Sequence, residues 1–260
     1  MAQPTDQITG LDAVGVIERL ASMHRGQGAV VAFDADGTLW SGDVSEDVFE
    51  AALDADRFRE EALEALRKAA AAHGLSERGT ATEVARALYT AYHQGAFPES
   101  AVVEMMTWCY AGWSVSELRR FTEQVLAERK LEQRLCRKLE PILEYARNSG
   151  LRTVVISASP KGIVERAAAL WSFAPPDIAA AETVTVAGRI QARLLHPVPY
   201  ADAKPAAARR LFDGAEWLAS FGDNVFDVPM FEAARLGVAV EPKLSLRQKL
   251  PELKNVVLLK

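Results

Sequence analysis

The stretch AVVAFDADGT (residues 29–38) decides how the rest of this chain is interpreted. Its apolar first half is typical of a strand that is buried on both faces of a sheet. Asp34 and Asp36 follow where that strand ends, and Gly37 turns the chain. Because open α/β sheets bind their ligands at the carboxyl ends of parallel strands, this stretch predicts a functional site.

The two aspartates suit phosphoryl transfer and metal binding, but they also suit a simpler role. One carboxylate can attack phosphorus as a nucleophile while its neighbour handles the proton of the leaving group. A Mg²⁺ ion, which prefers oxygen ligands, would offset the repulsion between two close carboxylates. Aspartate is also common in the turns that follow strands, so these two residues alone leave a purely structural role open.

The composition excludes several classes of protein. Of the 260 residues, 49% are hydrophobic and 25% are charged, the ordinary balance of a soluble globular protein. The net charge of −5 provides no general basic field for binding nucleic acid or a membrane surface. Two cysteines, no apolar run of bilayer length and an amino terminus without signal-peptide features predict a cytoplasmic location.

Residues 41–146 differ in character from the rest of the chain. They are rich in Ala, Leu, Glu and Arg, their apolar residues recur at helical spacing, and no convincing strand is present. Three pairs have the spacing of a helix capping box: Asp43 with Glu46, Thr80 with Glu83, and Ser114 with Glu117. We predict that residues 41–146 form a helical cap domain, and that residues 1–40 and 147–260 form the core domain.

The chain on both sides of this segment predicts alternating strands and helices. Strand patterns cover residues 153–156, 217–221, 237–240 and 256–259, and residues 183–186 and 190–195 predict a hairpin. Helical patterns cover residues 11–25, 161–171 and 204–212. This order predicts an α/β fold with a Rossmann-like, doubly wound and mainly parallel sheet.

Three of the predicted strands end in polar side chains. These are Asp34 and Asp36, Ser157 and Ser159, and Asp223 and Asn224. Parallel strands share one carboxyl edge, so the three groups should lie close together despite their separation in the sequence. A purely structural role would need a separate explanation for each group, and their convergence therefore favours a functional site.

Four motifs of the sequence resemble, in order, those of the haloacid dehalogenase superfamily of phosphatases. They are DADGT (residues 34–38), SAS (residues 157–159), Lys204 and GDNVFD (residues 222–227). A helical cap between the first and second motifs is similar to the subgroup that contains phosphoserine phosphatase. The cap sequence itself shows no close match, so the resemblance does not specify the substrate.

The resemblance implies a division of roles among the aspartates. Asp34 would be the nucleophile that forms an aspartyl-phosphate. Asp36 would protonate the leaving oxygen and then activate the water that hydrolyses this intermediate. The carboxylates of Asp34 and Asp223, with the backbone carbonyl of Asp36, would bind Mg²⁺.

The resemblance also implies roles for residues around the phosphoryl group. Ser157 would donate a hydrogen bond to the phosphoryl oxygens, and Lys204 would neutralise their charge. Lys161 is the alternative cation because it follows the serine motif directly, but the order of the motifs favours Lys204. Asp227 would orient Lys204 or support the metal shell, although a helix N-cap would also explain this residue.

The remaining candidate residues have supporting roles. Gly37 and Gly222 should permit tight backbone turns near the phosphate, and Thr38 and Asn224 lie beside the aspartates of their motifs. Asp43 and Glu46 follow the first motif closely, where they could contact substrate from the cap. Their capping-box spacing explains them fully, so we favour a structural role for both.

Together, these features predict a Mg²⁺-dependent hydrolase of small phosphomonoesters, with a phosphoserine-like compound as one candidate substrate. A phosphomutase would keep the same residues but protect the aspartyl-phosphate from water. A protein that only binds a phosphorylated ligand would gain little from a potential nucleophile. A dehalogenase would leave Asp36 and Asp223 without a purpose. The oligomeric state does not follow from the sequence.

Overall fold

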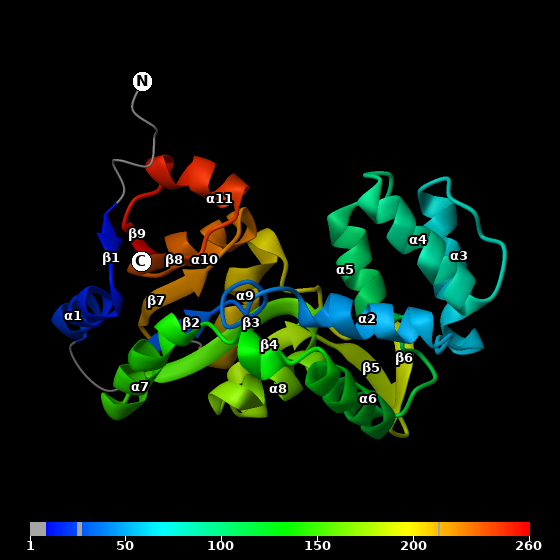
Figure 1. The fold of residues 1–260 in the computed structure, drawn as a ribbon, viewed down its shortest axis with the longest axis horizontal. Helices are drawn as coiled ribbons and strands as arrows, with labels where there is room; N and C mark the ends of the chain where they lie inside the picture. Colours follow the sequence, from blue (N-terminus) through cyan, green and yellow to red (C-terminus); the bar gives the residue numbers. More distant parts are fainter. Residues whose placement is uncertain (1–8, 25–27, 213) are drawn as a thin grey trace.

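The computed structural model of the protein describes residues 9–24, 28–212 and 214–260 and contains one large parallel sheet (Figure 1). Along the sheet, the seven strands are β1 (Gly10–Leu11), β9 (Val256–Leu259), β8 (Leu236–Val240), β7 (Trp217–Gly222), β2 (Val30–Phe33), β3 (Arg152–Pro160) and β4 (Ile178–Ala181). All of their pairings are parallel. The predicted α/β class and doubly wound sheet are therefore confirmed.

Strand β2 is apolar throughout because helices cover both faces of the sheet. Val30 and Ala32 point to one face, where they pack with side chains of α9 (Lys204–Phe212) and α10 (Val228–Ala233). Val31 and Phe33 point to the other face and join the main hydrophobic core. This core also contains side chains of α1 (Ala13–Met23), α7 (Glu140–Asn148) and α8 (Lys161–Ala168). Alternate residues of a strand point to opposite faces, so all four side chains are buried.

Two of the seven strands were not predicted. Strand β4 consists of Ile178 and three alanines, and alanine is a poor strand former. Strand β1 has two residues, and the helical pattern had included Leu11 in the following helix. That helix, α1 (Ala13–Met23), instead begins after Asp12, whose side chain accepts a hydrogen bond from the amide of Gly15. Its predicted end at Arg25 lies outside the described residues.

The helices form two groups. Those around the sheet are α1, α7 (Glu140–Asn148), α8 (Lys161–Ala168), α9, α10 and α11 (Leu244–Lys249). The helical block, as we call the other five, consists of α2 (Val44–Asp54), α3 (Glu60–Ala72), α4 (Ala81–His93), α5 (Glu99–Trp108) and α6 (Val115–Glu128). Every helix within the described parts of the chain is too short or too polar to cross a lipid bilayer.

The helical block lies to one side of the sheet, over β3 and α8 (Figure 1). Helix α7 begins before residue 146 and ends after it, and it packs against α1 and β3, which belong to the sheet layers. The division of the chain into a core and a cap domain at residues 41–146 stays a prediction.

The predicted hairpin is present as β5 (Thr183–Val186) and β6 (Arg189–Leu194), and it pairs with the helical block. The amide of Gly112, in the loop between α5 and α6, donates to the carbonyl of Ile190 at 3.0 Å. The amide of Ile190 donates to the carbonyl of Trp113 at 2.9 Å, and that of Val115 to Gly188 at 3.0 Å. The helical block is thus bonded to a chain segment that follows β4.

Candidate active site

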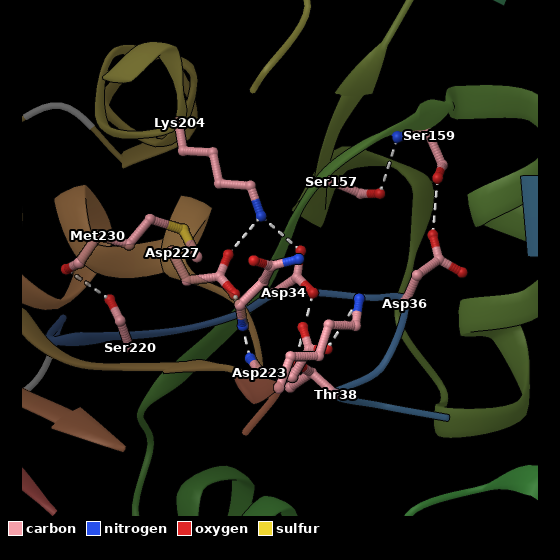
Figure 2. Close-up of polar contacts among 12 residues, drawn as sticks. Asp34, Asp36, Thr38, Ser157, Ser159, Lys204, Ser220, Asp223, Asp227 and Met230 are labelled. Carbon is pink, nitrogen blue, oxygen red and sulfur yellow. Dashed lines mark hydrogen bonds and ion pairs between the residues drawn. The ribbon is translucent and has the colours of Figure 1, made fainter. Parts of the chain in front are cut away.

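Three neighbouring strands bring the predicted motifs to one edge of the sheet. Phe33 of β2 is paired with Phe221 of β7 and with Val155 of β3. The residues that follow these positions lie side by side, because all three strands are parallel. They line a pocket together with a residue of α9: Asp34, Asp36, Ser157, Ser159, Lys204, Asp223 and Asp227. The structure thus gathers residues of all four motifs in one place (Figure 2).

Lys204 lies between two carboxylates at the floor of this pocket. Its Nζ donates to Oδ1 of Asp34 and to Oδ1 of Asp227, at 2.5 Å in each case. The lysine side chain is only 5% exposed, and a buried ammonium group needs such partners. Lys161, the alternative cation, instead forms an ion pair with Glu182 at 3.4 Å, away from Asp34.

Asp227 binds the loop after β7 as well as Lys204. Its Oδ2 accepts hydrogen bonds from the backbone amides of Asp223 and Asn224, at 3.1 and 3.0 Å. Asn224 is the N-cap residue of this short helical turn, Val225–Asp227. A Cβ at Gly222 would lie 2.5 Å from Cγ of Asp227, so Gly222 is needed for this close approach of the carboxylate.

Asp223 lies against Gly37 and Lys243. The φ of Gly37 is +82°, and a Cβ there would lie 2.1 Å from Oδ2 of Asp223. Glycine at this position therefore turns the chain after Asp36 and leaves room for the second carboxylate. Oδ2 of Asp223 is 3.1 Å from Nζ of Lys243, a residue that was not predicted. Lys243 is more than half exposed in a loop, and no sequence pattern distinguishes it from other surface lysines.

The carboxylate of Asp36 is held by three donors on the side of the helical block. Its Oδ1 accepts from Nε1 of Trp40 and from the amide of Val44, both at 2.8 Å. Its Oδ2 accepts from Oγ of Ser159 at 2.6 Å. The sequence predicts Ser159 only as a polar residue at the end of its strand. It does not predict the contact with Asp36, because the direction of a side chain is not visible in a sequence.

Ser157 lines the pocket, and Thr38 contacts Asp34. Oγ of Ser157 accepts a hydrogen bond from the amide of Ser159 at 3.1 Å, which leaves the hydroxyl proton of Ser157 available to a ligand. Oγ1 of Thr38 donates to Oδ2 of Asp34 at 3.3 Å. Both side chains are buried.

Asp43 and Glu46 lie at the start of α2 and also line the pocket. Oδ1 of Asp43 accepts from the amides of Ser45 and Glu46 at 2.8 and 3.0 Å, so Asp43 is the N-cap of α2. Capping does not remove Asp43 from the pocket, because its carboxylate lies both at the helix end and at the pocket wall. Contact of either residue with substrate stays a prediction.

A family model described as haloacid dehalogenase-like hydrolase matches residues 31–232, which include all four motifs. The chain belongs to the haloacid dehalogenase-like hydrolases. Among curated proteins, none matches this sequence.

Solved structures resemble this haloacid dehalogenase-like hydrolase in fold at low sequence identity. A protein of unknown function from Bordetella pertussis Tohama I is 18% identical with a TM-score of 0.69, over 89% of this chain and 99% of that one. A functionally unknown protein from Anaerococcus prevotii DSM 20548 is 13% identical with a TM-score of 0.69, over 99% and 94%. A substrate-bound phosphoserine phosphatase is 14% identical with a TM-score of 0.53, over 89% and 100%. The resemblance to the phosphoserine phosphatase-like subgroup is thus supported.

The carboxylates of the hydrolase fit a hard divalent cation. One oxygen from each of Asp34, Asp223 and Asp227 can be chosen so that all three lie within 4.8 Å of one another. Both oxygens of Asp227 are already used by Lys204 and by two backbone amides. Oδ2 of Asp34 faces the neutral hydroxyl of Thr38 at 3.3 Å, and Asp223 faces the half-exposed Lys243. These two carboxylates are therefore the better candidates for Mg²⁺ ligands, and oxygen donors are the kind that this ion prefers. A contribution from the carbonyl of Asp36 stays a prediction.

The crowding of carboxylates changes their acidity. Burial, Asp227 and Asp223 raise the pKa of Asp34 well above its usual value, although Lys204 opposes them. Burial and then Asp43 raise the pKa of Asp36 to about 7. Burial and then Asp227 raise the pKa of Asp223 to about 6. Each shift disfavours the ionised form, first because the group is buried and then because other carboxylates lie close to it.

We expect the raised pKa of Asp36 to change how the stability of the protein depends on pH. Its ordinary pKa is 3.8, so between about pH 4 and pH 7 the unfolded chain loses this proton while the folded chain keeps it. The unaltered hydrolase in chelator should therefore lose stability relative to Asp36→Asn over this window. Each kcal/mol lost from the free energy of unfolding lowers Tm by about 2–4 °C. A constant Tm difference between the two proteins from pH 4 to pH 7 would contradict the shift.

Proposed function

We propose that this hydrolase is a Mg²⁺-dependent phosphatase that cleaves small phosphomonoesters through an aspartyl-phosphate on Asp34. The observation that carries the proposal is the setting of the Asp34 carboxylate. It is 7% exposed at the floor of the pocket, bonded to Lys204 and Thr38, with a second acidic residue, Asp223, close enough to share a cation. This setting combines a nucleophile with positive charge for the phosphoryl oxygens, as phosphoryl transfer requires.

The proposed first step is attack by a carboxylate oxygen of Asp34 on phosphorus. The new O–P bond forms as the ester O–P bond breaks, and the leaving oxygen takes a proton from Asp36. Ser157 and Lys204 bind the phosphoryl oxygens during this step. Mg²⁺, when bound by Asp34 and Asp223, would supply further positive charge for those oxygens.

The proposed second step returns Asp34 to its free form. A water molecule attacks the phosphorus of the aspartyl-phosphate, and Asp36 takes the proton of that water. Inorganic phosphate leaves, and both carboxyl groups end in their starting states. Asp36 thus serves first as an acid and then as a base at the same pocket wall.

The test is phosphate release from an aryl phosphate by the purified full chain in Mg²⁺. We expect turnover that stops on addition of chelator. A folded protein that binds phosphate but turns over neither aryl nor alkyl phosphates with Mg²⁺ would contradict the proposal and favour a non-catalytic binding role.

The wall of the pocket on the side of the helical block favours a small leaving group that carries a positive charge. The pocket holds about 110 Å³, well below the 300–1,000 Å³ of sites for drug-sized ligands. Asp43, Glu46 and Glu99 place carboxylates on its helical-block side. Lys204 and Lys243, the cations among the lining residues described, are paired with aspartates. The proposed substrates are therefore phosphate esters of amino alcohols in preference to phosphoserine, whose carboxylate would lack a partner.

Glutamine substitutions should weaken this preference. Glu46→Gln and Glu99→Gln keep the shape of the wall and remove a negative charge, so each should lower kcat/KM for aminoalkyl phosphates. We expect about a tenfold fall relative to uncharged alkyl phosphates, which corresponds to about 1.4 kcal/mol. The matched control is Glu104→Gln, an exposed position on the same helix as Glu99. If the ratio for the two substrates is unchanged in both variants, the wall does not select the leaving group.

A further inference from the structure

The three hydrogen bonds of Asp36 differ in kind. Nε1 of Trp40 and the amide of Val44 hold Oδ1, and both groups can only donate. Oγ of Ser159 holds Oδ2 at 2.6 Å, and a hydroxyl can donate or accept. Ser159 is 6% exposed at the end of β3, so water does not readily replace it. Figure 2 shows the Asp36 carboxylate turned toward Ser159.

Ser159 connects Asp36 to the first turn of α2 through a second hydroxyl. Its Oγ lies 3.1 Å from Oγ of Ser45, which is 5% exposed. Oγ of Ser45 in turn donates to Oδ1 of Asp43 at 2.6 Å. The chain Asp36–Ser159–Ser45–Asp43 thus joins the loop after β2, the end of β3 and the N-terminus of α2.

We propose that Ser159 is a positioning residue that aims the Asp36 carboxyl group at the leaving oxygen, and that Ser45 anchors Ser159 from α2. This role rests on the proposed function. In the carboxylate form of Asp36, Ser159 donates to Oδ2. In the acid form, the proton on Oδ2 is donated to Ser159, the Ser159 proton turns to Ser45, and Ser45 still donates to Asp43. When the leaving oxygen takes the proton from Oδ2, Ser159 turns its own proton back from Ser45 to Oδ2, so one hydroxyl stays bonded to this oxygen before and after proton transfer.

The positioning role of Ser159 predicts that its removal lowers activity by an amount that depends on the leaving group. An alkoxide leaves poorly without a proton, whereas p-nitrophenolate leaves without one. Ser159→Ala should therefore lower the rate of leaving-group release in a single turnover by about 10–100-fold for an alkyl phosphate, within the range of general acid catalysis, and by less than about threefold for p-nitrophenyl phosphate. Ser159→Thr keeps the hydroxyl and should restore most of the alkyl phosphate activity. Ser45→Ala should show the same selectivity with a smaller loss.

The matched control is Ser220→Ala. Ser220 is a buried strand serine on β7, and its Oγ donates to the carbonyl of Met230 at 3.0 Å, outside the pocket lining (Figure 2). This variant should lower Tm about as much as Ser159→Ala while leaving the ratio of the two substrates unchanged. Measuring Tm for every variant separates misfolding from loss of positioning.

The outcomes distinguish this role from the proposed function. Equal losses on both substrates in a folded Ser159→Ala protein, or no loss on either, would overturn the positioning role alone. A Ser159→Thr protein as impaired as Ser159→Ala would also overturn it, because the hydroxyl is then not the reason. An unaltered protein that hydrolyses neither substrate would overturn the proposed function first, and this role with it.

Discussion

Asp34→Asn is expected to abolish hydrolysis, with a loss in kcat of at least about 10³-fold. An amide cannot form the acyl-phosphate, and removal of a nucleophile typically costs this much or more. The fold should persist because Asn is nearly isosteric with Asp: its amide oxygen can accept from Lys204 while its NH₂ donates to the hydroxyl of Thr38. In chelator, Tm should rise, because the variant removes a buried carboxylate whose ionised form is disfavoured by burial and by the charges of Asp227 and Asp223.

Asp202→Asn is the matched control for this prediction. Asp202 is exposed in the turn just before Lys204, so the same chemical change there should leave turnover intact. Intact mass measurement of the unaltered protein, quenched during turnover, should show a phosphoryl adduct that Asp34→Asn lacks. Substantial turnover by folded Asp34→Asn would show that the nucleophile lies elsewhere.

Asp223→Asn is expected to raise the Mg²⁺ concentration for half-maximal activity by more than about tenfold. Asp34 and Asp223 are the better placed of the clustered acidic residues to bind the cation, because the oxygens of Asp227 accept from Lys204 and two backbone amides, so loss of the Asp223 charge should weaken cation binding directly. Activity should be lost in chelator and weakened in Ca²⁺, because calcium forms longer bonds with higher coordination numbers.

This second prediction can be checked without turnover. Mg²⁺ should raise Tm of the unaltered protein at pH 7.5, because a ligand that binds only the folded state stabilises it. The rise should be much smaller for Asp223→Asn and unchanged for Asp202→Asn. An unchanged Mg²⁺ requirement in Asp223→Asn would remove this carboxylate from the metal site, and full activity in chelator would exclude the metal altogether.

The sheet and the motif residues could be predicted from the sequence because both depend on local patterns. An apolar run followed by polar residues predicts a strand and its carboxyl end, and parallel strands bring such ends together. The order of the motifs selected Lys204 over Lys161, and the ion pairs of the two lysines agree with that choice. The roles of these residues in catalysis stay predictions.

The features that were missed depend on tertiary contacts. Strand β4 is mostly alanine and exists because β3 offers a free edge beside it. Lys243 reaches Asp223 because the loop after β8 turns back over β7. The link from Ser159 through Ser45 joins residues 114 positions apart, and no local pattern marks either hydroxyl. Contacts of this kind follow from the packing of elements and not from the spacing of residues.

The pairing of the β5–β6 hairpin with the loop between α5 and α6 has a consequence for protein engineering. Chimeric enzymes are often built by exchanging an inserted segment at its two junctions, here the residues on either side of α2–α6. In this chain, such an exchange would leave the hairpin behind, and its residues Gly188 and Ile190 would lose the backbone partners that the exchanged segment supplies. Each backbone group left without a partner in a buried setting costs about 1–3 kcal/mol. A foreign helical segment would therefore need to be transplanted together with its own counterpart of residues 183–194.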